Sequence, residues 1–156
     1  MKLTANFTLD ELTKSQTAER KGINNNPSPK QIENLKALAV NILQPIRSHY
    51  NEPLQISSGF RCAELCVAIG SKITSQHVAD ENAAAADFEI WGKDNKKVAT
   101  YIKENLEFDQ LILEFYKEGE PNSGWIHCSY SSNENRNQCL YAFREDGKTK
   151  YTPWLV

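Results

Sequence analysis

The chain reads Ser57-Ser58-Gly59-Phe60-Arg61, then Ser75-Gln76-His77 and Ala85-Ala86-Asp87-Phe88-Glu89-Ile90, and then Gly124-Trp125-Ile126-His127, and these segments decide how it folds. Two of its three histidines lie in this stretch, with a carboxylate between them. Two imidazoles and one carboxylate form a donor set that binds a hydrolytic zinc ion and leaves one coordination position free. The stretch therefore predicts a metal centre within the fold.

Length and composition indicate an ordinary globular protein. At 156 residues the chain has the size of one domain, and we expect residues 1–156 to form it. The formal net charge of −2 lacks the basic excess of a nucleic-acid binder. No apolar run approaches a membrane span, and the N-terminus does not read as a signal peptide, so we expect synthesis in the cytoplasm and no membrane insertion. In that compartment the four cysteines are expected to be reduced thiols.

Helices dominate the first part of the chain and strands the second. A capping box joins Thr8 to Glu11, and a long amphipathic helix begins at Pro29 and is expected to kink at Pro45. Shorter helices are expected at residues 61–69 and 96–105. Strands are expected at residues 54–57, 85–91, 108–115, 125–130, 138–144 and 149–155. This order predicts a small α+β domain with helices packed on a mostly antiparallel sheet.

The candidate metal ligands are His77, Asp87 and His127. Asp87 ends an alanine run whose small side chains allow a compact site. Asp80 and Glu81 are rival carboxylate ligands because they lie closer to His77 in the sequence.

The candidate general bases are Glu114 and Asp109, since a carboxylate beside the attacking water is the usual base in zinc hydrolases. Only one of them is expected to reach the site, because side chains five positions apart on a strand point to opposite faces. Arg61 is a candidate for binding a substrate carboxylate or a developing oxyanion. His49 is interpreted as an ordinary residue on the face of the long helix.

Seven segments, taken together and in this order, resemble the zinc D-alanyl-D-alanine carboxypeptidase family of peptidoglycan peptidases, and in particular its small phage and bacterial endolysin-like members. They are Phe7-Thr8-Leu9-Asp10-Glu11-Leu12, Lys14-Ser15-Gln16-Thr17-Ala18-Glu19-Arg20, Ser57-Ser58-Gly59-Phe60-Arg61, Ser75-Gln76-His77, Ala85-Ala86-Asp87, Phe108-Asp109-Gln110-Leu111-Ile112 and Trp125-Ile126-His127.

The resemblance implies a hedgehog/D-Ala-D-Ala peptidase-like fold with Zn²⁺ held by His77, Asp87 and His127. It also implies that Ser75, Arg61 and Trp125 contact the substrate.

Two departures from the family pattern need an explanation. Nine residues separate His77 from Asp87 where the family usually has six, which we interpret as a three-residue insertion near residues 79–81. Many relatives carry an acid three positions before the last histidine, but this chain has Gly124 there. The base must then lie elsewhere, and we expect Glu114, with Asp109 as the second choice.

The resemblance predicts a monomeric zinc peptidase that cleaves the cross-links or stem peptides of peptidoglycan, as an endolysin does after a separate holin releases it through the membrane. The alternative is a non-catalytic, zinc-stabilised domain on the same scaffold, used for cell-wall binding or virion assembly. The missing acid at Gly124 is the feature that favours this alternative. A metal-free globular domain is a third interpretation.

Overall fold

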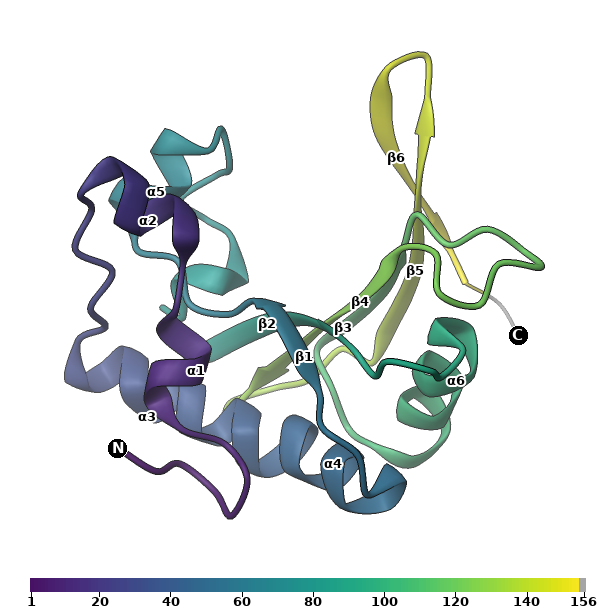
Figure 1. The fold of residues 1–156 in the computed structure, drawn as a ribbon, viewed down its shortest axis with the longest axis horizontal. Coiled ribbons are helices and arrows are strands. Elements are labelled where there is room, and N and C mark those ends of the chain that lie inside the picture. The colour runs from purple at the N-terminus through teal and green to yellow at the C-terminus, as the bar shows by residue number, and fades with distance from the viewer. Residues whose placement is uncertain (155–156) are drawn as a thin grey trace.

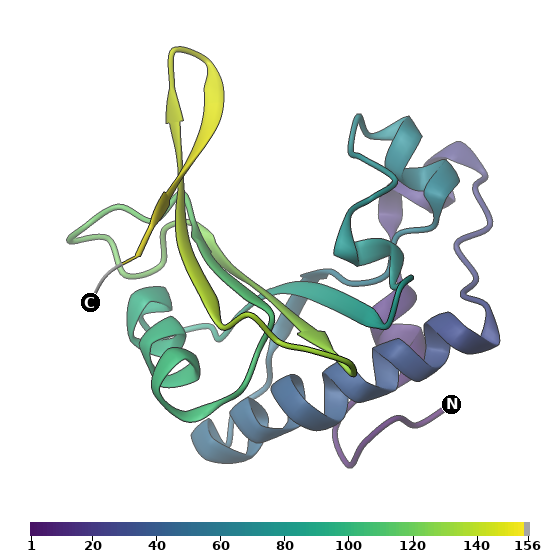
Figure 2. The same ribbon diagram turned by 180° about the vertical axis from the view of Figure 1, so that it is seen from behind.

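The computed structural model describes residues 1–154 and has an α+β fold, as the order of sequence elements predicts. Figures 1 and 2 show it from opposite sides. A six-stranded sheet has the order β1-β2-β4-β3-β5-β6. Its strands are β1 Gln55–Ser58, β2 Ala83–Glu89, β3 Gln110–Glu114, β4 Trp125–Ser131, β5 Gln138–Glu145 and β6 Lys148–Pro153. The α-helices are α1 Leu9–Thr13, α2 Gln16–Lys21, α3 Pro29–Leu38, α4 Gln44–Tyr50, α5 Ala63–Ala68 and α6 Asn95–Asn105.

The long helix consists of α3, a π-helical segment η1 (Ala39–Leu43) and α4. It begins with a capping box in which Ser28 and Gln31 satisfy each other's backbone N–H groups. Within η1 the Gln44 N–H donates to the Ala39 carbonyl, five residues back. This wider turn falls immediately before Pro45, which has no N–H to donate. The helix therefore continues past the proline to the end of α4.

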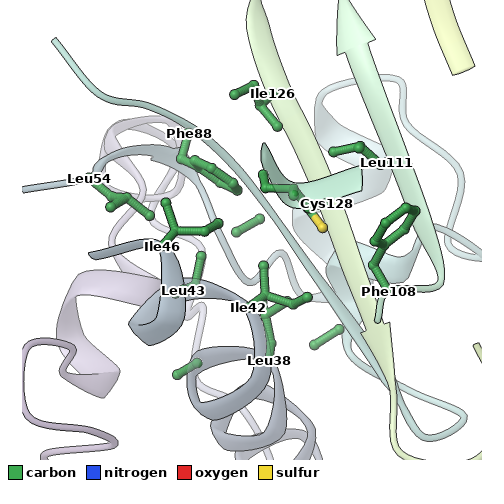
Figure 3. Close-up of a cluster of buried hydrophobic side chains, with 14 of the residues drawn as sticks. Leu38, Ile42, Leu43, Ile46, Leu54, Phe88, Phe108, Leu111, Ile126 and Cys128 are labelled. Atoms are coloured by element: carbon green, nitrogen blue, oxygen red, sulfur yellow. The ribbon is translucent and has the colours of Figure 1, made fainter. Parts of the chain in front are cut away.

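The hydrophobic core lies between this long helix and one face of the sheet. Figure 3 shows apolar side chains of the helix meeting side chains of β2, β3 and β4. The labelled residues are Leu38, Ile42, Leu43, Ile46, Leu54, Phe88, Phe108, Leu111, Ile126 and Cys128. Alternate residues of the same strands point to the opposite face. The core thus fixes which side chains are left to line that face.

Gly59 joins the N-terminal helix to the sheet. The Phe60 N–H donates to the Leu12 carbonyl at 2.7 Å, at the end of β1. A Cβ atom on Gly59 would lie 2.2 Å from the same carbonyl oxygen, so the approach requires glycine. The helix α1 begins with the predicted Thr8 cap, whose hydroxyl accepts from the Glu11 N–H.

Several predicted boundaries were wrong. The helix expected from Arg61 begins at Ala63, and α2 was not predicted because its six residues are too short for a clear apolar period. Strand β5 pairs with β3 on the side opposite β4, and this pair is parallel, whereas the other strand pairs of the sheet are antiparallel. The last predicted strand residue, Leu155, lies outside the described residues. No helix within residues 1–154 is long and apolar enough to cross a membrane.

Gly124 permits the close approach between the loop before β4 and the end of β3. Its φ is +65°, and a Cβ atom there would lie 1.9 Å from the Glu114 carbonyl oxygen. An acidic side chain is therefore excluded at this position by backbone contact. This contact explains physically why the chain has glycine at position 124.

We predict that Gly124→Ala destabilises the fold by about 3 kcal/mol, because a left-handed φ and a backbone clash act together. Gly119→Ala is the matched control, since Gly119 has a φ of +83° but nothing within 4 Å of its Cβ position. The control should lose only about 1 kcal/mol. Urea unfolding followed by circular dichroism measures both, and equal losses would show that the clash is relieved at no cost.

Candidate metal centre

Three side chains from separate elements converge on one point. His77 lies on the 3-10 helix η2 (Gln76–Val78), Asp87 on β2 and His127 on β4. Antiparallel pairing places Asp87 directly opposite His127. Each residue offers one ligand atom, and these atoms all lie within 4.8 Å of one another. Within residues 1–154 this is the only group of three or more such side chains with that geometry.

The orientation of His77 is fixed by a backbone carbonyl. Its Nδ1 lies 2.7 Å from the Gly59 oxygen, which only accepts hydrogen bonds, so Nδ1 carries the proton. The other nitrogen, Nε2, lies 3.3 Å from Oδ1 of Asp87 and is left unprotonated as a donor for a metal ion. The Ser75 hydroxyl accepts from the His77 N–H and caps the short helix.

The charge state of the cluster suits a cation. Burial by itself would raise the pKa of Asp87, but the rings of His77 and His127 hold it well below its usual range. Nδ1 of His127 lies 2.9 Å from Oδ1 of Asp87. Burial lowers the pKa of His77 below its ordinary value, even beside that carboxylate. The site therefore presents an anionic carboxylate and a neutral imidazole, the forms that ligate zinc.

The segment with the proposed insertion turns back outside the cluster. Ala79, Glu81 and Asn82 all have positive φ and form a tight turn between η2 and β2. Asp80 accepts a hydrogen bond from Gln31 of the long helix at 3.1 Å. Neither Asp80 nor Glu81 belongs to the three-residue cluster, although both line the cleft above it.

Glu114 faces the same cleft as the cluster. In the β3–β4 register Ile112 pairs with His127, and Glu114 pairs with Trp125. Side chains two apart share a face of a strand, so Glu114, Trp125 and His127 point the same way. Burial, reinforced by the charge of Asp87, raises the pKa of Glu114 to about 7 from an ordinary 4.5. A carboxyl with that pKa can take up and release a proton near neutral pH.

Asp109 is held by other groups. It precedes β3 and accepts two hydrogen bonds from the Arg136 guanidinium, at 3.0 and 2.8 Å, and one from Gln76 at 2.6 Å. These bonds, the Arg136 guanidinium first among them, lower the pKa of Asp109. Asp109 thereby links Gln76, the residue before His77, to Arg136 in the segment before β5. Sequence reasoning listed it as a base and missed this network, because Arg136 stands in no recognisable motif.

Arg61 lies in the extended segment between β1 and α5. Its backbone N–H donates to the His77 carbonyl at 2.8 Å, and the residue lines the cleft above the cluster. Its Nε is buried and has no hydrogen-bond partner among residues 1–154. A buried donor without a partner is costly, so a ligand oxygen is favoured there.

The cleft above the cluster has a volume of about 810 Å³. Its lining includes the three residues expected to contact substrate, Ser75, Arg61 and Trp125, and the expected base Glu114. Tyr151 of β6, which was not expected at the site, also lines it.

The four cysteines, in contrast, are free thiols outside the cluster, and Cys128 is buried in the core. The ring of His49 stacks on the ring of Tyr101, with the two ring centroids 3.9 Å apart. His49 is not part of the cluster, which agrees with its interpretation as an ordinary helix residue.

The donor set fits zinc. Two imidazoles and one carboxylate converge, and the Gly59 carbonyl fixes the tautomer of His77. The cleft leaves room for water and substrate. Such an arrangement can support metal-assisted hydrolysis.

Comparison with known proteins agrees with this chemistry. The family model described as Peptidase M15 matches residues 5–129, a range that contains all three candidate ligands, Arg61 and Glu114. No curated protein matches the chain.

We predict that His77→Ala and Asp87→Ala each lose bound zinc, because a site with three protein ligands binds far more weakly with two. His49→Ala and Asp80→Ala are the matched controls and should retain about one zinc per chain, since neither side chain belongs to the cluster. Elemental analysis after dialysis against zinc measures the content. Zinc loss in Asp80→Ala with retention in Asp87→Ala would move the ligand into the inserted segment.

We predict that Glu114→Gln stabilises the metal-free protein more at pH 8 than at pH 5. The folded pKa of Glu114 is about 7 against 4.5 ordinarily, so folding is penalised increasingly as pH rises through this window. The difference in unfolding free energy between variant and parent should grow by on the order of 3 kcal/mol. Urea unfolding in a chelator at the two pH values measures it, and the other titrating groups cancel. A pH-independent difference would contradict the burial of this carboxyl.

Proposed function

This chain belongs to the peptidase M15 family, and we propose that it is a zinc peptidase that hydrolyses peptide bonds of peptidoglycan, in the manner of an endolysin. The bond cut lies in the cross-links or in the stem peptides, by carboxypeptidase or endopeptidase action. The observation that carries the proposal is a metal-ligand cluster and a carboxyl of raised pKa facing one open cleft.

Zinc held by His77, Asp87 and His127 supplies the Lewis acidity that makes water nucleophilic near neutral pH. Glu114 accepts the proton of the attacking water and passes it to the leaving amine. Its raised pKa suits both steps, because a group that titrates near the working pH exchanges protons readily in either direction.

Arg61 binds the oxygen atoms of the substrate. Its partnerless Nε supports this role, since a carbonyl oxygen or terminal carboxylate would complete its hydrogen bonding. Ser75 and Trp125 line the cleft and orient the peptide.

The competing proposal is a non-catalytic domain, stabilised by zinc, for wall binding or virion assembly. Gly124 favours it because many members of the family that the sequence resembles carry an acid at this position. Glu114 supports the enzyme instead, since its carboxyl reaches the same cleft and can supply the missing base.

Digestion of purified peptidoglycan by the zinc-loaded protein separates the two. The enzyme should release peptides detectable by mass spectrometry, should stop when a chelator is added, and should recover when zinc is restored. A zinc-loaded protein that releases no peptide from any wall preparation would establish the binding domain.

We predict that Glu114→Gln retains zinc and fold but loses wall-degrading activity by about 10²–10⁴-fold, as removal of a general base typically does. Glutamine preserves shape and hydrogen bonding yet cannot accept the proton. Asp109→Asn is the comparison and should lose less, because that carboxylate binds Arg136 and Gln76. The assignment of the base would be reversed if Asp109→Asn were inactive with its fold intact while Glu114→Gln stayed active.

A further inference from the structure

The β5–β6 hairpin adds a wall to the cleft beyond the part of the chain that matches the family. The match ends at residue 129, and the hairpin begins at Gln138. In Figure 1 the hairpin rises from the sheet on the side opposite α2 and α5. The cleft is lined from both sides, by Ser71 and Ile73 of the segment after α5 and by Tyr151 of β6.

Strand register places Tyr151 in line with the proposed base. Trp125 pairs with Glu114, Glu114 pairs with Ala142, and Ala142 pairs with Tyr151. The four residues therefore form one row across β4, β3, β5 and β6 on the face that carries the metal cluster. Ala142 has only a methyl group, so no bulky side chain separates Tyr151 from Glu114.

The Tyr151 side chain is available to a ligand. The residue is 55% exposed although it lines the cleft, and its hydroxyl makes no hydrogen bond to any residue in the described range. Burial and the negative charges of Glu114 and Asp87 raise its pKa, which agrees with a ring directed toward the site. An exposed aromatic ring in a concave site is a typical contact for a bound peptide.

The distance from the cluster corresponds to several peptide residues. Strands β4, which carries His127, and β6, which carries Tyr151, are three strand spacings apart, or about 14 Å at ~4.8 Å per spacing. The tyrosine side chain spans part of this distance. Because an extended peptide advances about 3.3 Å per residue, its chain would meet the ring some two to four residues from the bond being cut.

We propose that Tyr151 forms a distal substrate subsite whose ring packs against the peptide two to four residues from the scissile bond, about the reach of an extended chain. Arg61, beyond β1, and Tyr151, on β6, then hold opposite ends of the substrate, with the metal cluster between them. The peptidase accordingly prefers oligopeptides to dipeptides. This inference rests on the proposed function and names the substrate class for the same site.

Calorimetric binding to the zinc-loaded Glu114→Gln protein tests it without turnover. The probes are the stem pentapeptide L-Ala-γ-D-Glu-L-Lys-D-Ala-D-Ala and the dipeptide D-Ala-D-Ala. Adding Tyr151→Ala should weaken pentapeptide binding about tenfold and dipeptide binding less than about twofold, as loss of one aromatic contact does. Tyr151→Phe should stay within about twofold of the parent, because it keeps the ring.

Lys150→Ala is the matched control. Lys150 is the exposed neighbour of Tyr151 on β6 and points to the other face, so its removal should leave both affinities unchanged. Circular dichroism verifies that each variant folds. Tight pentapeptide binding that Tyr151→Ala does not alter would overturn the subsite alone. Failure of both peptides to bind the parent would overturn the proposed substrate class and this inference with it.

Discussion

The antiparallel register between β2 and β4 is the constraint on which the site depends. It sets Asp87 opposite His127 while Phe88 and Ile126 face the core. A slip of β2 by one residue would send Asp87 into the hydrophobic layer and Phe88 into the cleft, because strand side chains alternate strictly. Burying the apolar residues under the long helix therefore excludes the wrong register. Core packing thus helps to position the candidate metal ligands.

Two close backbone approaches complete the site. At Gly59 the absence of a Cβ lets the chain meet the Leu12 carbonyl, and the Gly59 carbonyl in turn orients the His77 ring. At Gly124 the same absence lets the chain pass over the Glu114 carbonyl. Each glycine is thus linked through the backbone to a candidate site residue, Gly59 to His77 and Gly124 to Glu114. An acidic side chain at position 124 is incompatible with this hairpin, and Glu114 on the paired strand lines the cleft.

The electrostatics of the site oppose stability in the absence of a cation. Asp87 keeps its charge although it is buried, because two imidazole rings adjoin it. Ionisation of Glu114 costs free energy because the carboxyl is buried and lies near the charge of Asp87, so its pKa rises to about 7. A bound cation relieves both conditions, since it offsets the charge of the two carboxylates. The same crowding that makes the metal-free site costly gives Glu114 a pKa suited to proton transfer.

The sequence by itself determined the α+β class, most of the strands and the set of candidate ligands, because periodicity and short motifs are local properties. It left the ligand carboxylate open among Asp80, Glu81 and Asp87, and it could not separate Glu114 from Asp109. Tertiary structure separated these candidates by position: Asp87 belongs to the ligand cluster, and Glu114 lines the cleft while Asp109 binds Arg136. Register, the turn at residues 79–82 and the Arg136 contact to Asp109 join residues far apart in the chain. The same long-range pairing decided that β5 lies parallel to β3 and that Tyr151 faces the cleft. No local pattern encodes such contacts, because they arise only when the whole sheet is assembled over one core.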